Sequence, residues 1–459
     1  MEKWIDPLKK LISPDNLLIE KSSCWAYSYD NSNIRVVPDA VVFGDSQEQI
    51  QSLVKFCNDF HIPLTTRGRG TGTTGGSVPT EGGIVLSLEK MDKILEIDFK
   101  NRLACVQPGV INQALQDAIA EYNLFWPPDP SSSNYCTIGG NLANNSAGPR
   151  AIKYGTPREN TLALSAIAGS GELLKTGATT TKSVVGLDLT RLLIGSEGTL
   201  AIITEATLKI LPKNEAIGML QAFYADIDSA VMAVINIMGQ SVVPYTLEFI
   251  DDTSIQLIQS FSNIRFPEKT RSMLIIEVDG QKKHIADLLS ILEKTADNAG
   301  CIKIKKASSA EKMQEIWKTR KALSPALKKV APKKINEDVV VPITNLTKLI
   351  SGLKNISQKH AINIVNFGHA GNGNIHVNLL TSTSSYEDRD LQKCLLDVFD
   401  LVLKLNGTLS GEHGVGVVKR DYIEKELDSN TLKIMRSIKE KFDPNNILNP
   451  GKALPLEIR

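Results

Sequence analysis

A glycine-rich segment, IPLTTRGRGTGTTGGSVPTEGGIVLSL (residues 62–88), constrains the fold of this chain more than any other feature. Gly70, Gly72 and Gly75 formally match the GxGxxG fingerprint of dinucleotide-binding folds. That fingerprint requires a loop that opens a helix, whereas here Gly76 and the residues after it lead through another turn into the strand-like IVLSL. The segment therefore argues against a Rossmann-type domain and predicts a glycine-rich turn between two strands.

Two further glycine-rich segments follow, and the three together indicate a cofactor site. In the first segment, successive glycines let backbone N–H groups surround a pyrophosphate without a helix, with Arg67 or Arg69 supplying positive charge. The second, WPPDPSSSNYCTIGGNLANNSAG, carries Asn141 and Asn144, whose amides can hydrogen-bond the edge of a flavin ring. The third is GSEGTLAIITEATL. Each segment alone is also explained as a tight turn between strands, so the hypothesis depends on their occurrence in one region.

The order of the expected elements predicts an α+β protein with more than one domain. A chain of 459 residues exceeds what one hydrophobic core usually organises. Residues 38–212 contain short β-rich runs between clusters of Gly, Ser, Thr and Asn, and form the first domain in this interpretation. Residues 213–420 alternate amphipathic helices with single strands, which predicts a second domain with an antiparallel sheet covered by helices. Residues 1–37 and 421–459 are expected to be helical, the latter returning to the first domain.

Composition and charge exclude several classes of function. The chain is 42% hydrophobic and 22% charged with a formal net charge of +1, which is typical neither of disorder nor of a nucleic-acid-binding surface. The N-terminus does not resemble a signal peptide, and the longest apolar runs are far shorter than the roughly 20 residues of a membrane span. We therefore expect a soluble, cytoplasmic protein. The six cysteines form no CxxC motif, so electrons must leave by something other than an iron–sulfur cluster in this chain.

Three of the six histidines lie in two glycine-rich motifs near the C-terminus. INIVNFGHAGNGNIHVNLL predicts a strand, a turn and a second strand, so that His369 and His376 face each other across a hairpin at about 5 Å between Cβ atoms. Asn378 shares the strand face of His376. The loop SGEHGVG adds Glu412 and His413. Two imidazoles and a carboxylate suit Zn²⁺ or another first-row divalent ion with open positions, although an isolated histidine hairpin is also explained as a hydrogen-bonded pair that supports a turn.

The motifs resemble those of a known family over nearly the whole chain. RGRGTGTTGG, TIGGNLANNSAG with KYGTPREN, and GSEGTLAIITEATLKILP resemble the flavin segments of the vanillyl-alcohol-oxidase superfamily, which has a PCMH-type FAD-binding domain of two subdomains. FGHAGNGNIHVN, SGEHGVG and FDPNNILNPGK resemble its branch of D-lactate dehydrogenase, glycolate oxidase D subunit and D-2-hydroxyglutarate dehydrogenase. The resemblance implies a PCMH-type FAD-binding domain over 38–212 and a substrate or cap domain over 213–420. It also implies non-covalent FAD, because the first loop lacks the histidine to which some members attach it.

The resemblance assigns roles to individual residues. Metal ligation by His369, His376 and Glu412 is carried over from the family, with Zn or Mn/Fe as the ion. We interpret His413 as the general base, because adjacent side chains in an extended loop diverge and an imidazole titrates near neutrality. Arg320 matches a family arginine that binds the substrate carboxylate.

The remaining expected contacts concern substrate and FAD. Ser324 and Asn378 complete the expected substrate contacts. The expected FAD contacts are Arg67, Gly68, Gly70, Thr71, Gly72, Thr73, Thr74, Gly75, Ile138, Gly139, Gly140, Asn141, Asn144, Gly148, Tyr154, Gly155, Ile203 and Asn449.

The sequence thus predicts an FAD-dependent dehydrogenase that oxidises a small D-2-hydroxy acid, D-lactate or glycolate, to the 2-oxo acid. D-2-hydroxyglutarate is a competing substrate prediction. Ser324 stands where that branch has a threonine and Asn336 where it has a lysine, but Lys333 or Lys334 would compensate for the missing lysine. Two competing interpretations of the whole chain are an electron-relay flavin subunit and a member of the ether-forming alkylglycerone-phosphate synthase branch.

We also expect partners besides the substrate. The electron acceptor is a quinone, an electron-transfer flavoprotein or an iron–sulfur subunit. We further expect a homodimer or complex subunit, peripheral membrane association only through a partner, and no nucleic acid.

Overall fold

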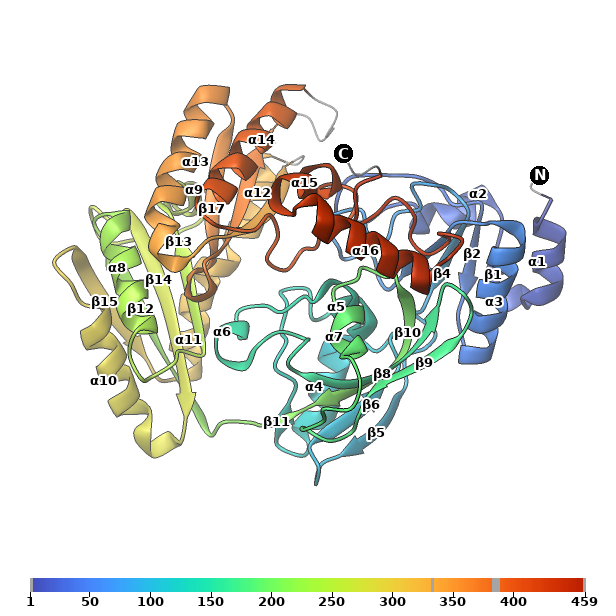
Figure 1. Cartoon of the computed structure of the whole chain (residues 1–459). Coiled ribbons are helices and arrows are strands. Elements are labelled where there is room, and N and C mark those ends of the chain that lie inside the picture. The colour runs from blue at the N-terminus through green and yellow to red at the C-terminus, as the bar shows by residue number, and fades with distance from the viewer. Residues whose placement is uncertain (1–2, 332–333, 382–388, 457–459) are drawn as a thin grey trace. The chain divides into compact units, whose positions relative to one another are not determined.

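The computed structural model describes residues 3–331, 334–381 and 389–456, apart from the side chain of Ser324. The chain divides into two compact units (Figure 1). The first unit contains Met1–Gly148, Gly155–Lys213 and Glu412–Arg459, and the second contains Pro149–Tyr154 and Asn214–Gly411. Both units combine helices with sheets, which confirms the expected α+β class. None of the helices within the described ranges has the length and apolar content that crossing a bilayer requires.

A four-stranded sheet in the first unit carries the glycine-rich segment. Its strand order is β1 (Leu17–Leu18), β2 (Ala40–Phe43), β4 (Ile84–Ser87) and β3 (Leu64–Arg67), with β2 and β3 both parallel to β4. Helix α3 (Gln47–Phe60) packs on it through Ile50, Leu53, Val54 and Cys57, and α1 (Ile5–Leu11) joins the same core. The spacing of these four apolar residues places them on one helix face. Each side chain so buried contributes roughly 1.5–3 kcal/mol.

A five-stranded antiparallel sheet forms the other half of the first unit. Its order is β5 (Ile94–Asp98), β6 (Leu103–Val106), β10 (Ala201–Lys209), β8 (Thr161–Ala168) and β9 (Leu173–Gly177). A small ladder joins β7 (Leu124–Phe125) to β11 (Leu211–Pro212). The helices of this unit are α1, α2 (Lys21–Cys24), α3, α4 (Asn112–Ala120), α5 (Ile138–Asn144), α7 (Leu189–Leu193), α15 (Ile423–Glu426) and α16 (Ser429–Phe442). Side chains of α4 and α5 pack in the core of this sheet, so the two sheets give the two subdomains expected of the FAD-binding domain.

The second unit is built on a seven-stranded sheet in which every neighbouring pair of strands is antiparallel. The order is β15 (Cys301–Ala307), β12 (Ala216–Tyr224), β14 (Ser272–Gly280), β13 (Thr246–Ile250), β17 (Asn363–His369), β18 (Asn374–Leu380) and β16 (Ile335–Val340). This confirms the antiparallel sheet covered by helices. Its helices are α6 (Ala151–Tyr154), α8 (Ile227–Met238), α9 (Asp252–Phe261), α10 (Ile285–Ala296), α11 (Ala310–Lys321), α12 (Leu323–Val330), α13 (Leu346–His360) and α14 (Arg389–Lys404).

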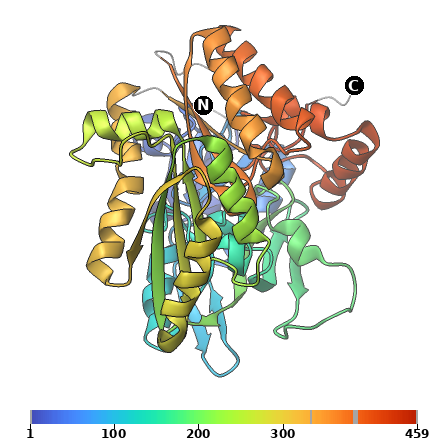
Figure 2. The ribbon, with the colours of Figure 1, turned by 90° about the vertical axis from the view of Figure 1, so that its left-hand side faces the viewer.

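Helices cover both faces of this sheet, as Figure 2 shows with α8 and α10 on one side and α9 and α11 on the other. Apolar side chains of α9, α11 and α12 pack with strand residues such as Ile250, Ile275 and Phe367. Residues that alternate along a strand share one face, so this same face also presents Glu248, His369 and further polar residues of β13, β16, β17 and β18. The sheet face that α9, α11 and α12 partly cover is therefore apolar over one part and polar over another.

Candidate active site

The loop between β3 and the following turn offers a row of backbone donors in the first unit. None of the backbone N–H groups from Gly68 to Ser77 donates a hydrogen bond to another described residue. On the opposite side of the loop, the carbonyl groups of Thr71 and Gly72 accept hydrogen bonds from Asn31 at 3.1 and 2.9 Å. Half-buried N–H groups without protein partners need another acceptor, and phosphate oxygens suit such a concave row of donors.

Positive φ angles and buried hydroxyls in this loop also fit a bound cofactor. Gly70 and Gly75 have φ angles of 64° and 78°, which only glycine adopts readily. The buried hydroxyl groups of Thr66 and Thr73 have no hydrogen-bond partner among the described residues. Because buried polar atoms are rarely left unsatisfied, these hydroxyls and the loop donors fit the diphosphate-bearing FAD that the sequence predicts.

The buried side chain of Arg67 packs against the glycine-rich loop. Its side chain is 7% exposed, and its guanidinium donates to the carbonyl of Tyr29 at 2.7 Å and to Ser77 Oγ at 3.4 Å. It lies so close to Gly70 that no Cβ would fit there. Arg69 is half exposed and pairs with Glu89 at 3.7 Å. The contact of either arginine with a pyrophosphate stays a prediction.

The second glycine-rich segment packs directly against the first. Thr137 caps α5 by accepting a hydrogen bond from the N–H of Gly140 at 3.2 Å, and its hydroxyl fills the space beside Gly68. Asn141 is buried and accepts from Asn112 Nδ2 at 3.0 Å. The sequence of α5, with two glycines and asparagines, therefore brings small residues and amides next to the loop that carries the donors.

Some expected FAD contacts have other surroundings. Tyr154 belongs to the second unit, where its hydroxyl donates to Asp279 at 2.6 Å and where burial and this carboxylate raise its pKa. Ile203 is buried in the core of the five-stranded sheet. Gly148 and Gly155 both have positive φ angles, consistent with tight turns at these positions. The FAD contacts of these four residues stay predictions.

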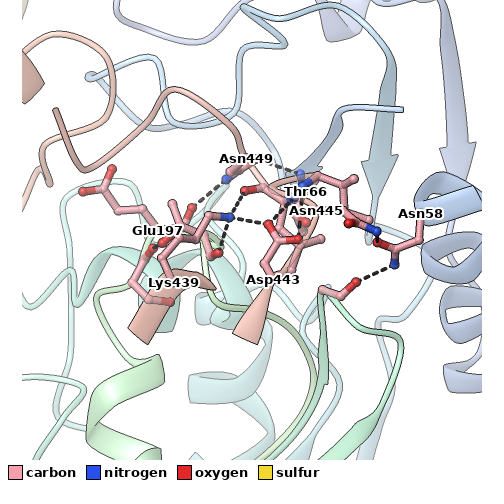
Figure 3. A network of polar contacts seen from close by, with 12 residues as sticks. Asn58, Thr66, Glu197, Lys439, Asp443, Asn445 and Asn449 are labelled. Carbon is pink, nitrogen blue, oxygen red and sulfur yellow. Dashed lines mark hydrogen bonds and ion pairs between the residues drawn. The ribbon is translucent and has the colours of Figure 1, made fainter. Parts of the chain in front are cut away.

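The third segment and the C-terminal turn meet at Asn449 and Glu197 (Figure 3). Asn449 accepts a hydrogen bond from the N–H of Thr66 at 3.2 Å and donates to the carbonyl of Glu197 at 2.6 Å. Asp443 holds the same turn by accepting from the N–H groups of Ile447 and Leu448 at 3.1 and 2.8 Å. The turn DPNNILNPG, which the sequence indicated as a family motif with one expected FAD contact, thus joins segments that lie far apart along the chain.

The loop SGEHGVG is attached to the glycine-rich segments of the first unit. Glu412 accepts a hydrogen bond from the N–H of Gly148 at 2.9 Å, and the carbonyl of His413 accepts from Thr74 Oγ1 at 3.3 Å. The N–H of Val417 donates to the carbonyl of Thr74 at 2.8 Å. The residue predicted to be the base therefore belongs to the unit that carries the expected FAD contacts.

In the second unit, the histidine hairpin differs from the prediction in its register. His369 pairs with Asn374, and His376 pairs with Phe367. The two histidines are therefore diagonal neighbours on one face, because residues 370–373 form the turn and Asn374 closes it. Their ring centroids are still 5.2 Å apart with the rings nearly perpendicular. The prediction of directly facing Cβ atoms is wrong, but the rings do meet.

Glu248 connects His369 to Arg320. This residue of β13 is 1% exposed; its Oε1 contacts His369 Nδ1 and its Oε2 accepts from Arg320 Nε at 2.9 Å. Burial alone would raise the pKa of Glu248, but His369 and Arg320 outweigh it and hold the pKa below its usual range. Such a carboxylate fixes the orientation of a histidine ring. Sequence reading missed Glu248, although a charged residue inside the buried strand TLEFI was a usable signal.

Arg320 is positioned to bind an anion. Its guanidinium lies 4.3 Å above the ring of Phe367, and Phe367 is itself on the sheet face of His376. Neither terminal nitrogen of the guanidinium bonds another described residue. The two terminal nitrogens suit a bidentate bond to a carboxylate, and the Glu248 partner of Arg320 also contacts His369.

Asn378 lies on the same sheet face and is fully buried. Its amide donates to the carbonyl of Val365 at 3.2 Å, and its Oδ1 accepts from Lys334 Nζ at 2.9 Å. Burial, with the positive charges of Arg320 and Lys328, lowers the pKa of Lys334 to about 8. Lys333 and the side chain of Ser324 lie outside the described residues. Asn336 is the strand partner of Asn378.

Glu412 directly follows a residue that is anchored beside His376. The N–H of Gly411 donates to Asp338 Oδ2 at 2.7 Å, and Ser410 Oγ donates to its other oxygen at 3.1 Å. Asp338 is the β16 partner of His376. Gly411 is the last residue of the second unit, and Glu412 is the next residue along the chain.

Family models and curated relatives match nearly the whole chain. The model described as FAD linked oxidases, C-terminal domain matches residues 213–453, and the model described as FAD binding domain matches residues 38–177. The glycolate oxidase subunit GlcD of Bacillus subtilis (strain 168) is 36% identical over 456 residues, which cover 99% of this chain and 97% of the relative. The D-lactate dehydrogenase of Archaeoglobus fulgidus is 34% identical with coverage of 98% and 99%, and the D-2-hydroxyglutarate dehydrogenase of Stutzerimonas stutzeri (strain A1501) is 31% identical with coverage of 98% of both chains.

Solved structures share the fold. A p-cresol methylhydroxylase with bound substrate superposes with a TM-score of 0.83 at 18% identity, covering 99% of this chain and 97% of the other. An alkyldihydroxyacetonephosphate synthase has a TM-score of 0.75 at 22% identity, covering 98% and 84%. These likenesses confirm the PCMH-type fold expected from the sequence.

Proposed function

The chain belongs to the FAD-linked oxidases and is an FAD-dependent oxidoreductase, and from this premise we propose that it oxidises D-lactate or glycolate to the 2-oxo acid. The observation that carries the proposal is Glu248, whose two oxygens contact His369 and Arg320. One buried carboxylate thereby orients both His369, a candidate metal ligand, and Arg320, a candidate binding group for the substrate carboxylate. A 2-hydroxy acid needs both, one for its hydroxyl and one for its carboxylate.

FAD fits the first unit, where the loop from Gly68 to Ser77 presents its N–H groups and Thr66 and Thr73 present buried hydroxyls. When bound, FAD supplies the acceptor for the hydride that leaves the substrate Cα. We propose that the remaining expected contacts, including Asn141, lie along it. The absence of a histidine from the loop supports non-covalent binding.

A divalent metal fits the imidazoles of His369 and His376 together with the carboxylate of Glu412. The support is the 5.2 Å separation of the two rings, the Glu248 contact that orients His369, and the anchoring of Gly411 beside the partner of His376. Zn, Mn or Fe suits two nitrogens and one oxygen. The ion would polarise the substrate hydroxyl and lower its pKa.

The chain's own residues perform the remaining steps. Arg320 binds the substrate carboxylate through its two terminal nitrogens, and Asn378 supports this side of the site by accepting a hydrogen bond from Lys334. His413 takes the hydroxyl proton as the general base, the role that histidine most often has in proton transfer. The apolar ring of Phe367 beneath Arg320 keeps water from the guanidinium and so strengthens its bond to the carboxylate.

D-2-hydroxyglutarate is a second candidate because of Lys334. This lysine is cationic below about pH 8, faces the same side as Asn378 and Asn336, and forms no ion pair with a described carboxylate. A second substrate carboxylate would supply that missing counter-charge. The lysine thus stands two residues from the position at which the resemblance expects one.

Electrons leave the reduced flavin for an external acceptor in this proposal, namely a quinone, an electron-transfer flavoprotein or an iron–sulfur subunit. Relatives named as subunits of glycolate oxidase support a place in a complex. We propose that the protein acts in the cytoplasm as a homodimer or as such a subunit.

Anaerobic bleaching of the bound flavin tests the proposed reaction. Metal-supplemented protein is mixed with D-lactate, L-lactate, glycolate and D-2-hydroxyglutarate, and the flavin absorbance is followed. We expect reduction by a D-acid or glycolate with one equivalent of 2-oxo acid formed. Arg320→Met should weaken acid binding about 10- to 100-fold, the loss of charge-assisted bonds, whereas Arg265→Met at an exposed position should not. Flavin that stays oxidised with all four acids would instead support the electron-relay interpretation.

A further inference from the structure

Glu197 has a buried carboxylate whose two oxygens are both used by one loop. Its side chain accepts hydrogen bonds from the N–H groups of Val415 and Gly416, each at 2.7 Å. These two residues follow His413 and Gly414, and the Gly414 Cα is so near the carboxyl group that a Cβ would lie 3.1 Å from it. The carboxylate therefore holds the backbone immediately after the histidine that we assign as the base.

The loop is held on its other side by Thr74. Thr74 Oγ1 donates to the carbonyl of His413 at 3.3 Å, and the carbonyl of Thr74 accepts from the N–H of Val417 at 2.8 Å. A Cβ at Gly416 would overlap with Thr74. Residues 413–417 thus have attachments at both ends and in the middle, and the shortest are the two bonds to the Glu197 carboxyl group, each at 2.7 Å.

The backbone of Glu197 is itself in an unfavourable conformation. Its φ angle is 55°, in the left-handed region that glycine or asparagine adopts at lower cost. The conformation is fixed by its N–H bond to Ala143 at 2.8 Å and by the bond from Asn449 to its carbonyl at 2.6 Å (Figure 3). Strained residues persist where the surrounding structure and their role demand them. Here the strain aims the carboxylate at the loop that follows His413.

We propose that Glu197 is a positioning residue for the reaction: it holds the loop so that the His413 imidazole reaches the substrate hydroxyl. The inference rests on the proposed role of His413. It assigns a function to the glutamate of the third glycine-rich segment, GSEGT, beyond any contact of that segment with FAD. Replacement by glutamine keeps the size, but an amide nitrogen cannot accept the second N–H bond.

Stopped-flow flavin reduction tests the proposal in FAD-loaded, metal-loaded protein, with the acid of the panel that reduces the parent fastest. Glu197→Gln should slow the limiting rate of reduction by about 10-fold or more, since a displacement of about 1 Å can cost about 100-fold. The acid concentration for half-maximal rate should change little, because Arg320 still binds the carboxylate. The matched control is Asp251→Asn, which alters another buried carboxylate that accepts two backbone N–H bonds, from Ser254 at 2.8 Å and from Asn366 at 3.2 Å.

Asp251→Asn should lower the thermal midpoint but leave the reduction rate per bound flavin at the parental value. Equal slowing in both variants would show that the Glu197 effect is general loosening, and would overturn the proposal. A parental rate in Glu197→Gln would overturn it as well.

A double-variant cycle separates this inference from the proposed function. In the His413→Ala background, Glu197→Gln should slow reduction by less than about twofold, because coupled residues are not additive. An unchanged factor in both backgrounds would show that Glu197 acts independently of His413 and would reject the inference alone. If His413→Ala by itself reduced its flavin at the parental rate, the assigned base would be wrong.

Discussion

The glycine-rich loop of the first unit and the polar sheet face of the second unit present binding groups of opposite kinds. Between Gly68 and Ser77 the donors are backbone N–H groups, and the side chain of Arg67 serves to support the loop. On the sheet face, Glu248, His369 and Arg320 act through side chains whose charges compensate one another. A site made of backbone depends on chain conformation, whereas a site made of side chains depends on charge and protonation.

This difference predicts how each region responds to substitution. In the loop, added negative charge should strongly weaken FAD binding, while pH should have little effect on it. On the sheet face, variants that keep the fold should bind metal or acid less well, and the effects should follow protonation. We expect substitution of the buried Glu248 to be the most costly on this face, because removing one partner of a buried charge pair costs about 3–5 kcal/mol.

Gly72→Asp should have the largest effect. A Cβ at Gly72 meets only Asp30 Oδ2 at 3.9 Å, so the position has room and the added carboxylate acts by charge. FAD binding should weaken at least about 100-fold, since like charges brought together cost several kcal/mol. Gly72→Ala is the matched control and should retain FAD. Flavin fluorescence after gel filtration measures both, and an Asp variant that keeps its flavin would contradict the backbone cradle.

His413→Ala should have the second-largest effect. The rate of flavin reduction should fall roughly 10²–10⁴-fold, which is the range for removal of a general base. FAD and metal content should stay at parental levels, because His413 is assigned to neither. The exposed His284 provides the control substitution to alanine. His376→Ala should differ by losing the metal. Single-turnover flavin reduction, with FAD and metal content measured on the same samples, tests the role of His413 as the base. Loss of metal from His413→Ala would instead show that His413 is a metal ligand.

Glu248→Gln should weaken metal binding by about 10- to 100-fold, the range for loss of a carboxylate that orients a ligating histidine. Glu277→Gln is its control, because Glu277 is also buried on this face but bonds Trp317 and Thr246 at 2.8 and 3.0 Å. Competition with a chelator of known affinity gives both metal dissociation constants. Equal values for the two variants would leave Glu248 with a structural role only.

Substitution of Lys334 should have the smallest effect, and the substrate binding that this lysine supports should show the clearest dependence on pH. Its pKa is lowered to about 8, so it is cationic below that pH and neutral above it. Binding of D-2-hydroxyglutarate should therefore weaken about 10-fold as pH rises through 8, the loss of one charge-assisted bond, while FAD binding stays constant. Lys334→Met should remove this dependence, whereas substitution of the exposed Lys329 by methionine should not. Identical profiles for D-2-hydroxyglutarate and D-lactate would remove the second candidate substrate.

The features that the sequence predicted well are local ones. The rejection of a Rossmann loop after Gly70 follows from the turn and strand that come next, and the structure has no helix there, since β4 follows the loop. The antiparallel sheet of the second unit follows from alternating helices and strands. The histidine hairpin was predicted, but its register was not, because the four residues after His369 form a turn closed by Asn374.

Residues that act through distant partners escaped prediction. Glu248 lies 121 residues from His369 and 72 from Arg320 along the chain, and Glu197 lies 218 residues from Val415. No spacing rule connects such positions, because the sheet order and the loop path bring them together. Arg67 was predicted from its charge alone, and the sequence did not indicate that its side chain is buried and bonds Tyr29 and Ser77.

Removal of the metal tests most directly the claim that the backbone of the glycine-rich loop holds the flavin, while side chains such as His369 and Arg320 hold the metal and the substrate. The protein is treated exhaustively with a chelator, and the flavin spectrum and its anaerobic reduction by the preferred acid are recorded before and after Zn²⁺ or Mn²⁺ is restored. We predict an unchanged oxidised flavin spectrum, strongly slowed reduction, and recovery with the ion. Full-rate reduction by metal-free protein would contradict the claim and would leave His369, His376 and Glu412 as structural residues.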